Sequence, residues 1–565
     1  MKPSANPFAA TFSSIFNTAA HGHVAKGCRP AVRLCGLLSG ALALVGGQRA
    51  MGASQTWDGG SSGSGSNGNW GTVANWDGAI PGSTAITTNT DVATFGAAIL
   101  NTWGDAVGNP VVIDANRNIG GISFTLQSGN YFIGAAVGNA LKLTSGGAIQ
   151  ILAGLTATNA VETINAPLAI QLANGTYTFA NDSANGTGVG AGTLNFGGGI
   201  TGAVAGATVL NLYGSNTNAN TISGIIGNGT ATSLAVTKAG TGTWVLSGNN
   251  IYTGPTTINA GTLSASTIVA GGSLGNATSP VTLGSGSTKG TLSYTGSTAD
   301  YARGLTIGGH LGVLNVTTAG QTLTVSSGNV TGTGLFTVGG AGNTTITSNL
   351  THNGSLAKAD TGTLTLSGTG NAYANTYVNA GTLIVGAGSS TGTGTVTVAK
   401  SGTLGGTGAI NGALTVEREG THSPGDSPGT QNVKGTATYQ AGSIFVWDIV
   451  DGTGADLGTY DKVAATGLLG GSGAFFNIIN SGGFTTSFWD ANKSWTDIFT
   501  VPPGSTALDV IFAGGFGGSV PANGIVAGEG SFAFTGNTLN WTAVPEPTTA
   551  LAGLLIMGGL LRRRR

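Results

Sequence analysis

Apolar and polar residues alternate with a period of two in many short stretches of the chain. Runs of this kind occur at 141–143, 281–283, 323–325 and 396–398, each with apolar residues at both ends and Lys or Thr between them. Gly, Asn and Ser bound the runs, a pattern typical of short strands joined by tight turns. Gly and Asn tolerate positive φ, so the chain can turn sharply after each strand. The sequence predicts many short strands.

Two segments of the chain repeat each other. Residues 238–263 align over residues 358–383 at a constant offset of 120 without a gap, and 14 of the 26 aligned positions are identical. The shared pattern is KAxTGTxxLSG followed by NAGTL, and the apolar pair Trp244 and Leu246 is matched by Leu364 and Leu366. Self-similarity of this kind indicates a repeat architecture. Coils stacked about 4.8 Å apart would pair each strand with its equivalents, so we predict an all-β fold, a β-solenoid.

The composition agrees with this fold class. The chain has 565 residues, of which 103 are Gly and only 7% are charged. The glycines have no strict three-residue spacing, which excludes collagen. Apolar residues make up 40% of the chain, whereas disordered chains have low hydrophobicity and high net charge. The glycine excess therefore predicts repeated turns rather than flexibility.

The N-terminal segment, residues 1–53, has the organisation of a secretory signal peptide. It contains five basic and no acidic residues, and an apolar run at 34–45 precedes small residues near Ala53. We expect cleavage between residues 50 and 54. Both cysteines, Cys28 and Cys35, lie in this leader, so the mature protein would have no disulfide.

The C-terminal segment combines three features in order. Pro545, Glu546 and Pro547 come first, an apolar stretch at 548–561 follows, and the chain ends in Arg562, Arg563, Arg564 and Arg565. A helix of this apolar stretch would span about 21 Å, which is short of the roughly 30 Å hydrocarbon core. The arginines should stay on the cytoplasmic side. We predict a short transmembrane segment that holds the protein transiently in the inner membrane.

This ending resembles the PEP-CTERM sorting signal. The resemblance implies export in a Gram-negative-type bacterium and processing by an exosortase-like membrane enzyme. It also implies an association with exopolysaccharide or biofilm, because substrates of that system often accompany both.

The repeats resemble the autotransporter-associated β-strand repeat family. The first repeat matches through Thr237, Lys238 and residues 246–254, the second departs at 368–373, and the resemblance continues through 402–408 and 423–429. It implies a right-handed parallel β-helix on an exported surface protein. The chain ends in the predicted sorting signal rather than in the translocation domain of an autotransporter, so we do not expect it to export itself.

These observations predict five segments. They are a signal peptide at 1–53, an N-terminal cap at 54–110, a β-solenoid at 111–435 with its clearest repeats at 234–266 and 356–430, a C-terminal β-rich cap or domain at 436–542, and the sorting signal at 543–565. A cap is needed because the first coil of a solenoid has an unpaired edge. The aromatic residues of the N-terminal cap are expected in its core rather than as platforms for sugar stacking.

The residues that could carry catalysis are few. A β-helix enzyme acting on polysaccharide, a lyase or hydrolase, is the alternative function, and it would need several carboxylates close together. Between Asp114 and Asp300 the only acidic residues are Glu162 and Asp182, and nothing in their spacing pairs them. Three histidines lie outside the leader and show no metal-ligand or triad pattern: His310, His352 and His422. We predict no catalytic residue and no cofactor.

The best metal candidates are four aspartates that surround a Gly-containing turn. They are Asp448, Asp451, Asp456 and Asp461. Carboxylates in such turns can bind calcium, but Asp is also a common turn residue without any ligand. Glu417 and Glu419, which flank Arg418, are expected on a solvated strand face. No basic patch indicates nucleic-acid binding.

The near-neutral total charge hides an acidic body. Residues 54–561 hold 11 of the 20 basic residues and all 21 acidic residues, which gives this part a formal net charge of −10. We therefore expect a non-enzymatic structural or adhesive protein of the cell surface, the outer membrane or the extracellular matrix. Its expected partners are the exosortase-like enzyme and an extracellular polysaccharide or a neighbouring cell surface, with no nucleic acid.

Overall fold

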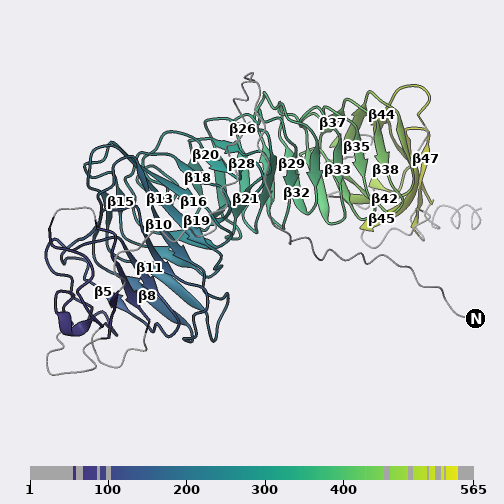
Figure 1. Cartoon of the computed structure of the whole chain (residues 1–565). Coiled ribbons are helices and arrows are strands. Elements are labelled where there is room, and N and C mark those ends of the chain that lie inside the picture. Colours follow the sequence, from purple (N-terminus) through teal and green to yellow (C-terminus); the bar gives the residue numbers. More distant parts are fainter. Residues whose placement is uncertain are drawn as a thin grey trace, which may run out of the picture. The chain divides into compact units, whose positions relative to one another are not determined.

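A computed structural model of the chain describes residues 55–58, 68–85, 89–96, 104–426, 428–450, 459–480, 488–505, 508–515, 524–526 and 530–544 (Figure 1). The chain divides into two units, Met1–Ala50 and Met51–Arg565, and every described residue belongs to the second unit. The predicted signal peptide, residues 545–565 of the predicted sorting signal, Asp451 and Asp456 lie outside the described residues.

The fold is a parallel β-helix, as the sequence predicts. Its first sheet contains β1 (Gln55–Thr56), β2 (Val92–Phe95), β4 (Gly121–Phe124), β7 (Ala148–Ile151), β10 (Gly175–Asn181), β13 (Ala207–Gly214), β16 (Ser233–Lys238), β18 (Thr256–Ile258), β20 (Val281–Leu283), β23 (Leu305–Ile307) and β26 (Val330–Gly332). All neighbours in this sheet pair in parallel. Parallel pairing of successive coils is what a solenoid requires.

A second sheet follows the first around the coil. It contains β5 (Phe132–Ile133), β8 (Ala160–Ile164), β11 (Gly192–Phe196), β14 (Asn220–Ile222), β17 (Thr243–Leu246), β19 (Gly261–Ala265), β21 (Lys289–Tyr294), β24 (Leu311–Val316), β27 (Leu335–Gly339), β29 (Leu356–Lys358), β31 (Thr376–Val378), β33 (Val396–Val398), β35 (Leu414–Val416), β38 (Ala437–Tyr439) and β42 (Leu469–Asn480).

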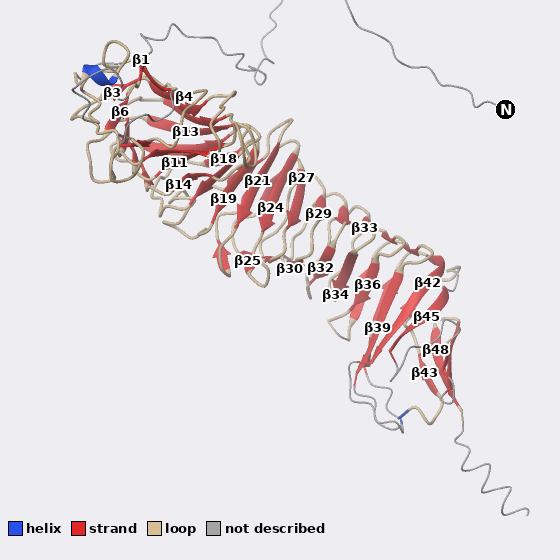
Figure 2. Ribbon diagram, turned by 90° about the horizontal axis from the view of Figure 1, so that it is seen from below, coloured by secondary structure: helices blue, strands red, loops and turns tan. Residues whose placement is uncertain are grey.

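The remaining side of the coil is built by two sheets. In the early coils this side is a short sheet, here called the fourth sheet because the longer one below is the third. It contains β3 (Asn118–Ile119), β6 (Leu141–Leu143), β9 (Leu168–Ile170), β12 (Ile200–Gly202) and β15 (Ile226–Gly227). Later coils use a third sheet of β22 (Ala299–Tyr301), β25 (Thr322–Val325), β28 (Asn343–Ile346), β30 (Thr363–Leu366), β32 (Gly381–Val385), β34 (Gly402–Gly406), β36 (Thr421–Pro424), β39 (Ile444–Val450), β42 and β45 (Asp509–Gly515) (Figure 2).

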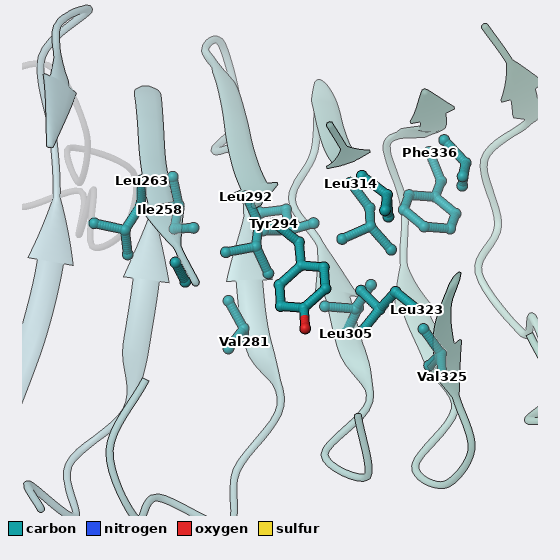
Figure 3. Packing of buried hydrophobic residues seen from close by; sticks show 14 of the residues in the cluster. Ile258, Leu263, Val281, Leu292, Tyr294, Leu305, Leu314, Leu323, Val325 and Phe336 are labelled. Atoms are coloured by element: carbon teal, nitrogen blue, oxygen red, sulfur yellow. The ribbon is translucent and has the colours of Figure 1, made fainter. Parts of the chain in front are cut away.

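The apolar residues of each alternating run point into the core of the coil, and the polar residues between them point outward. In β17, Trp244 and Leu246 are fully buried, whereas the residues between and before them are partly exposed. The runs at 141–143, 281–283, 323–325 and 396–398 all form strands with buried ends and a partly exposed centre. Figure 3 shows such side chains, among them Leu263, Leu292 and Leu314, gathered between the strands. The right-handed sense of the coil stays a prediction.

The aromatic residues of the predicted N-terminal cap lie in its core. β1 and β2 are the first rungs of the first sheet, and the one helical element among the described residues is η1 (Val73–Asn75), a single 3-10 turn. Trp57, Trp70 and Trp76 are buried and pack on one another and on Phe95, with ring centroids 5.0 to 6.0 Å apart. These rings therefore stabilise the first coils and present no platform for sugars.

The parallel ladder runs through the boundary predicted at 435/436. β38 pairs with β35, β39 pairs with β36, and both continue to β42. A small sheet of β37 (Thr430–Val433), β41 (Lys462–Ala465) and β44 (Phe499–Thr500) is also parallel, and β40 (Thr459–Tyr460) pairs antiparallel with β39. The segment 436–542 thus begins as further coils of the same solenoid.

An antiparallel sheet follows these last coils. It contains β43 (Lys493–Trp495), β46 (Ile525–Val526), β47 (Gly530–Thr535) and β48 (Thr538–Ala543). Phe534 packs against Phe476 of β42, with ring centroids 5.1 Å apart. The sheet therefore covers apolar surface of the last rungs. A search of the described residues finds no helix of the length and hydrophobicity needed to cross a membrane.

The two repeat segments lie on different sides of the coil. β16 and β17 of the first repeat belong to the first and second sheets, whereas the equivalent β29 and β30 belong to the second and third sheets. Paired residues of successive coils are 20 positions apart at Val236 and Thr256 but 25 apart at Thr257 and Thr282. An offset of 120 is therefore not a whole number of coils, and the second repeat is shifted by one side.

Candidate functional site

The lysine of the repeat pattern is buried and binds backbone carbonyls. Lys238 ends β16 and has no exposed surface. Its Nζ donates to the carbonyl oxygens of Ala239 at 2.9 Å, Gly240 at 2.8 Å and Ala260 at 3.1 Å. Ala260 lies in the next coil, so one side chain joins two turns. Burial lowers the pKa of Lys238 to about 7.

The second repeat contains the same arrangement. Lys358 ends β29 and donates to the carbonyl oxygens of Ala359, of Asp360 at 2.8 Å and of Ala380 at 3.3 Å. Burial lowers the pKa of Lys358 to about 8, and the nearby charge of Asp360 opposes this shift. The three carbonyl acceptors offset part of the cost of burying each amine, and each acceptor is a backbone carbonyl rather than a ligand or substrate group, so both lysines have a structural role.

The glycine of the NAGTL pattern is required beside this lysine. Gly261 has a φ of 68°, and a Cβ at this position would lie 2.7 Å from the Nζ of Lys238. Gly381 has a φ of 67°, and its Cβ would lie 2.7 Å from the Nζ of Lys358. Only glycine combines the left-handed conformation with this close approach. One lysine-bridged turn thus explains the shared lysine and the shared glycine of the two repeats.

A buried asparagine joins three successive coils in each repeat. Asn250 accepts from the N–H of Ile226 at 2.8 Å and donates to the carbonyl of Ser273 at 2.7 Å. Asn371 accepts from the N–H of Leu350 at 3.0 Å and donates to the carbonyl of Ser390 at 2.8 Å. The two asparagines are 121 positions apart, so the gapless alignment misses their equivalence.

A tyrosine two residues further on shows the same shift. The Tyr252 hydroxyl lies 2.9 Å from the Thr256 Oγ1, and the Tyr373 hydroxyl accepts from the Thr376 Oγ1 at 3.1 Å. Both tyrosines are buried, and burial raises the pKa of each to about 12. The apparent departure of the second repeat at 368–373 is therefore a one-residue shift within the same structure. The identities at 238–263 located these turns, but nothing in them gave the roles of the side chains.

The two acidic residues of the early coils have separate partners. Glu162 is fully buried and accepts from the Ser128 hydroxyl at 2.5 Å and the Tyr131 N–H at 3.0 Å. Burial raises the pKa of Glu162 to about 8. Asp182 instead accepts from the backbone and the hydroxyl of Ser215 at 2.9 and 3.0 Å. The structure gives no pairing of the kind that a glycosidic cleavage site needs.

The three histidines lie in different coils. His310 is exposed, whereas His352 and His422 are buried. The His422 Nδ1 lies 2.6 Å from the Tyr439 hydroxyl and its Nε2 lies 2.7 Å from the Gln431 Oε1. Burial lowers the pKa of His422 to about 4. This imidazole is held neutral in the core and is not presented to a substrate.

Two of the four candidate calcium ligands fall within the described residues. Asp461 accepts from the N–H of Gly429 at 2.9 Å and from the N–H of Asp448 at 3.1 Å. Burial raises the pKa of Asp461 to about 7, which these two donors oppose. The search of the described residues finds no group of three or more metal-binding side chains. The four-aspartate candidate set stays untested, since Asp451 and Asp456 lie outside the described residues.

The acidic residues near 418 lie in a turn and not on a strand face. β35 ends at Val416, and Glu419 has a φ of 65°. Its carboxylate forms an exposed ion pair with Lys400 at 2.8 Å, and the ion pair and hydrogen bond lower the pKa of Glu419. Exposed pairs of this kind contribute little to stability.

Comparison with known proteins matches the two repeats and a stretch of 181 residues. The family described as passenger-associated-transport-repeat matches residues 236–265 and 356–385. An adhesin, BmaC autotransporter of Brucella suis biovar 1 (strain 1330), is 36% identical over 181 residues, which is 31% of this chain. The match spans 4% of the length of that relative. The chain thus resembles a small part of an autotransporter adhesin, and the family match covers its two repeat segments.

Proposed function

We propose that this chain is an exported, non-enzymatic protein of the cell surface that acts as an adhesive or structural element. The observation that carries the proposal is that the residues shared by the two repeats make contacts inside the solenoid. The shared lysine and asparagine residues hold successive coils together, the glycine makes room for the lysine, and the tyrosine braces the local turn. A fold whose shared residues serve stacking offers its outer faces for binding, and a regular face can bind weakly at many points.

The similarity to an adhesin supports the same proposal. The matched relative is named an autotransporter adhesin, and the repeat family is described by its association with passenger transport. A secreted protein of the cell surface fits the acidic body, which carries a formal net charge of −10 over residues 54–561. The separate partners of Glu162 and Asp182 give the alternative, a polysaccharide lyase or hydrolase, no support.

The finer part of the proposal concerns export. The Pro545–Pro547 motif, the apolar stretch and the terminal arginines would direct the protein to an exosortase-like enzyme, with a transient stay in the inner membrane and an association with exopolysaccharide or biofilm. Calcium bound near Asp448 and Asp461 would be an accessory feature at most.

Cell fractionation tests this function. A tagged chain and a variant lacking residues 545–565 are expressed in a host that carries the sorting system. We expect the complete chain at the cell surface or in the matrix, and the truncated variant in another fraction. A tail-less variant with unchanged localisation would contradict the sorting signal, and a complete chain retained in the cytoplasm would contradict the surface function.

A further inference from the structure

The outer face of the third sheet carries a two-dimensional array of small polar side chains. We define the hydroxyl array as the outward residues of β25, β28 and β30, in which Thr322 and Thr324 lie beside Asn343 and Thr345, and these beside Thr363 and Thr365. Rungs are about 4.8 Å apart, and outward neighbours on one strand are about 6.6 Å apart. All six side chains are partly exposed.

The array differs from the outer face of the first sheet. There, the strands β18 and β20 have three residues each, with one outward threonine at the centre, Thr257 and Thr282. Together with Thr237 these form a single row. Over β18 and β20 the first sheet therefore presents one outward threonine per strand, whereas each strand of the array presents two. Earlier in the first sheet, β10 and β13 also have several outward residues per strand.

The hydroxyls of the array are available to a ligand. Within the described part of the chain, the Oγ1 atoms of Thr322, Thr324, Thr345, Thr363 and Thr365 make no hydrogen bond to protein. A threonine hydroxyl can donate one hydrogen bond and accept others. Such groups match the hydroxyls of a sugar polymer, which also donate and accept.

The charges around the array decide which polymers fit. None of its six residues is charged, and the acidic residues Asp300 and Asp360 lie at its borders, one beside Thr324 and the other in the turn before β30. The repeat lysines, Lys238 and Lys358, are buried inside the coil and offer no positive charge to a ligand. The local field therefore disfavours polyanions.

We propose that the hydroxyl array binds an uncharged polysaccharide. This inference rests on the proposed surface function and names the partner of its outer face. Each hydrogen bond contributes little in water, but a polymer lying across successive rungs meets the array at several points, so that avidity replaces single-site affinity. Binding of this kind is insensitive to salt, because no ion pair is involved.

Sedimentation with insoluble glycans tests the proposal on the purified full-length chain in non-ionic detergent. The probes are microcrystalline cellulose, chitin and curdlan as uncharged polymers, and carboxymethyl-cellulose as the charged counterpart of the first. We expect binding to at least one uncharged polymer that persists from about 0.05 M to about 0.5 M salt. Binding to carboxymethyl-cellulose should be weaker.

A matched pair of triple variants locates the site. Thr324→Val, Thr345→Val and Thr365→Val remove three adjacent hydroxyls of the array, and valine keeps the β-branched shape and the strand. Thr237→Val, Thr257→Val and Thr282→Val remove three adjacent hydroxyls of the first sheet. We expect the first triple variant to bind roughly five- to tenfold more weakly and the second to bind within about twofold of wild type.

Several outcomes would overturn the proposal. They are no binding to any uncharged polymer, equal loss in both triple variants, and stronger binding to carboxymethyl-cellulose that salt removes. Unchanged thermal unfolding of both variants shows that they are folded. The glycan-binding assay does not depend on where the protein is located in the cell. A protein that binds cellulose but fails to reach the surface would therefore contradict the proposed function and leave the glycan site intact.

Discussion

The two repeat segments have the same local structure on different sides of the coil. Lys238 and Lys358 bridge equivalent turns, but β16 lies in the first sheet and β29 in the second. The contacts of the pattern are made within its own turn or with the coils before and after it, so they need only a neighbouring coil and not a particular side. The repeat is thus a unit of coil stacking. Its position around the solenoid is set by the lengths of the intervening coils.

The largest expected effect follows removal of either lysine. Lys238→Met and Lys358→Met would each remove the donor to three carbonyl oxygens that are buried or partly buried, and we expect a loss of about 2 to 4 kcal/mol of stability. Denaturant unfolding followed by tryptophan fluorescence measures it. Lys400→Met, at an exposed lysine, is the control and should change stability by less than about 0.5 kcal/mol. A repeat lysine as tolerant as Lys400 would refute the bridged turn.

Replacing the glycine beside each lysine should have the next largest effect. Gly261→Ala and Gly381→Ala place a Cβ in a left-handed conformation, 2.4 and 2.2 Å from the nearest carbonyl oxygens. We expect a loss of about 1 to 3 kcal/mol in thermal unfolding. Gly320→Ala is the control, since its φ is also positive but its Cβ would have open space around it. If Gly261→Ala and Gly320→Ala lose the same stability, the cause is the positive φ and not the short distance between the new Cβ and the neighbouring backbone.

Removing a tyrosine hydroxyl should cost less. Tyr252→Phe and Tyr373→Phe each lose one buried hydrogen bond to a threonine, for which we expect about 0.5 to 1.5 kcal/mol. Similar losses would support the one-residue shift that makes the two tyrosines equivalent. An effect at Tyr252 with none at Tyr373 would indicate that the second repeat has lost this contact. Denaturant midpoints at constant slope are the measurement.

The smallest expected difference between the two repeats is in how stability depends on pH. Both lysines have pKa values below the ordinary value of about 10.4, so the unfolded chain binds more protons than the folded one above the folded pKa. Stability should therefore rise with pH, from about 7 upward for Lys238 and from about 8 upward for Lys358.

Asp360 provides the test of that difference. Its charge raises the pKa of Lys358, whereas Gly240 occupies the equivalent position in the first repeat. Asp360→Gly should move the start of the rise for the second repeat to lower pH. Unfolding at pH values between about 6 and 9.5, compared with the Lys358→Met variant, measures this shift. A stability that falls over this range because of Lys358 would contradict the assigned direction.

The sequence predicts the strands well and the roles of the shared residues poorly. Period-two alternation places Trp244 and Leu246 inside correctly, because a strand has only two faces. It gives no sign that Lys238 is buried, since lysine is rarely buried and its third acceptor, Ala260, lies 22 positions away.

The side of the coil that each repeat occupies could not be predicted either. A gapless alignment treats 120 residues as one period, but the coil lengths vary between the repeats. The same alignment hides the equivalence of Asn250 and Asn371. Turn length changes such registers without changing the pattern of apolar residues, so the pattern alone does not fix them.

Disulfide trapping tests the shifted register most directly, because the chain has no cysteine after Cys35. In the structure, Ala357 of β29 lies beside Thr337 of β27, whereas Thr331 lies in the first sheet. In a Cys28→Ser, Cys35→Ser background, the pair Thr337→Cys and Ala357→Cys should form a disulfide, because adjacent strands bring Cα atoms within the required range. The pair Thr331→Cys and Ala357→Cys should not. The reverse result would place both repeats on the same side of the coil and contradict the account.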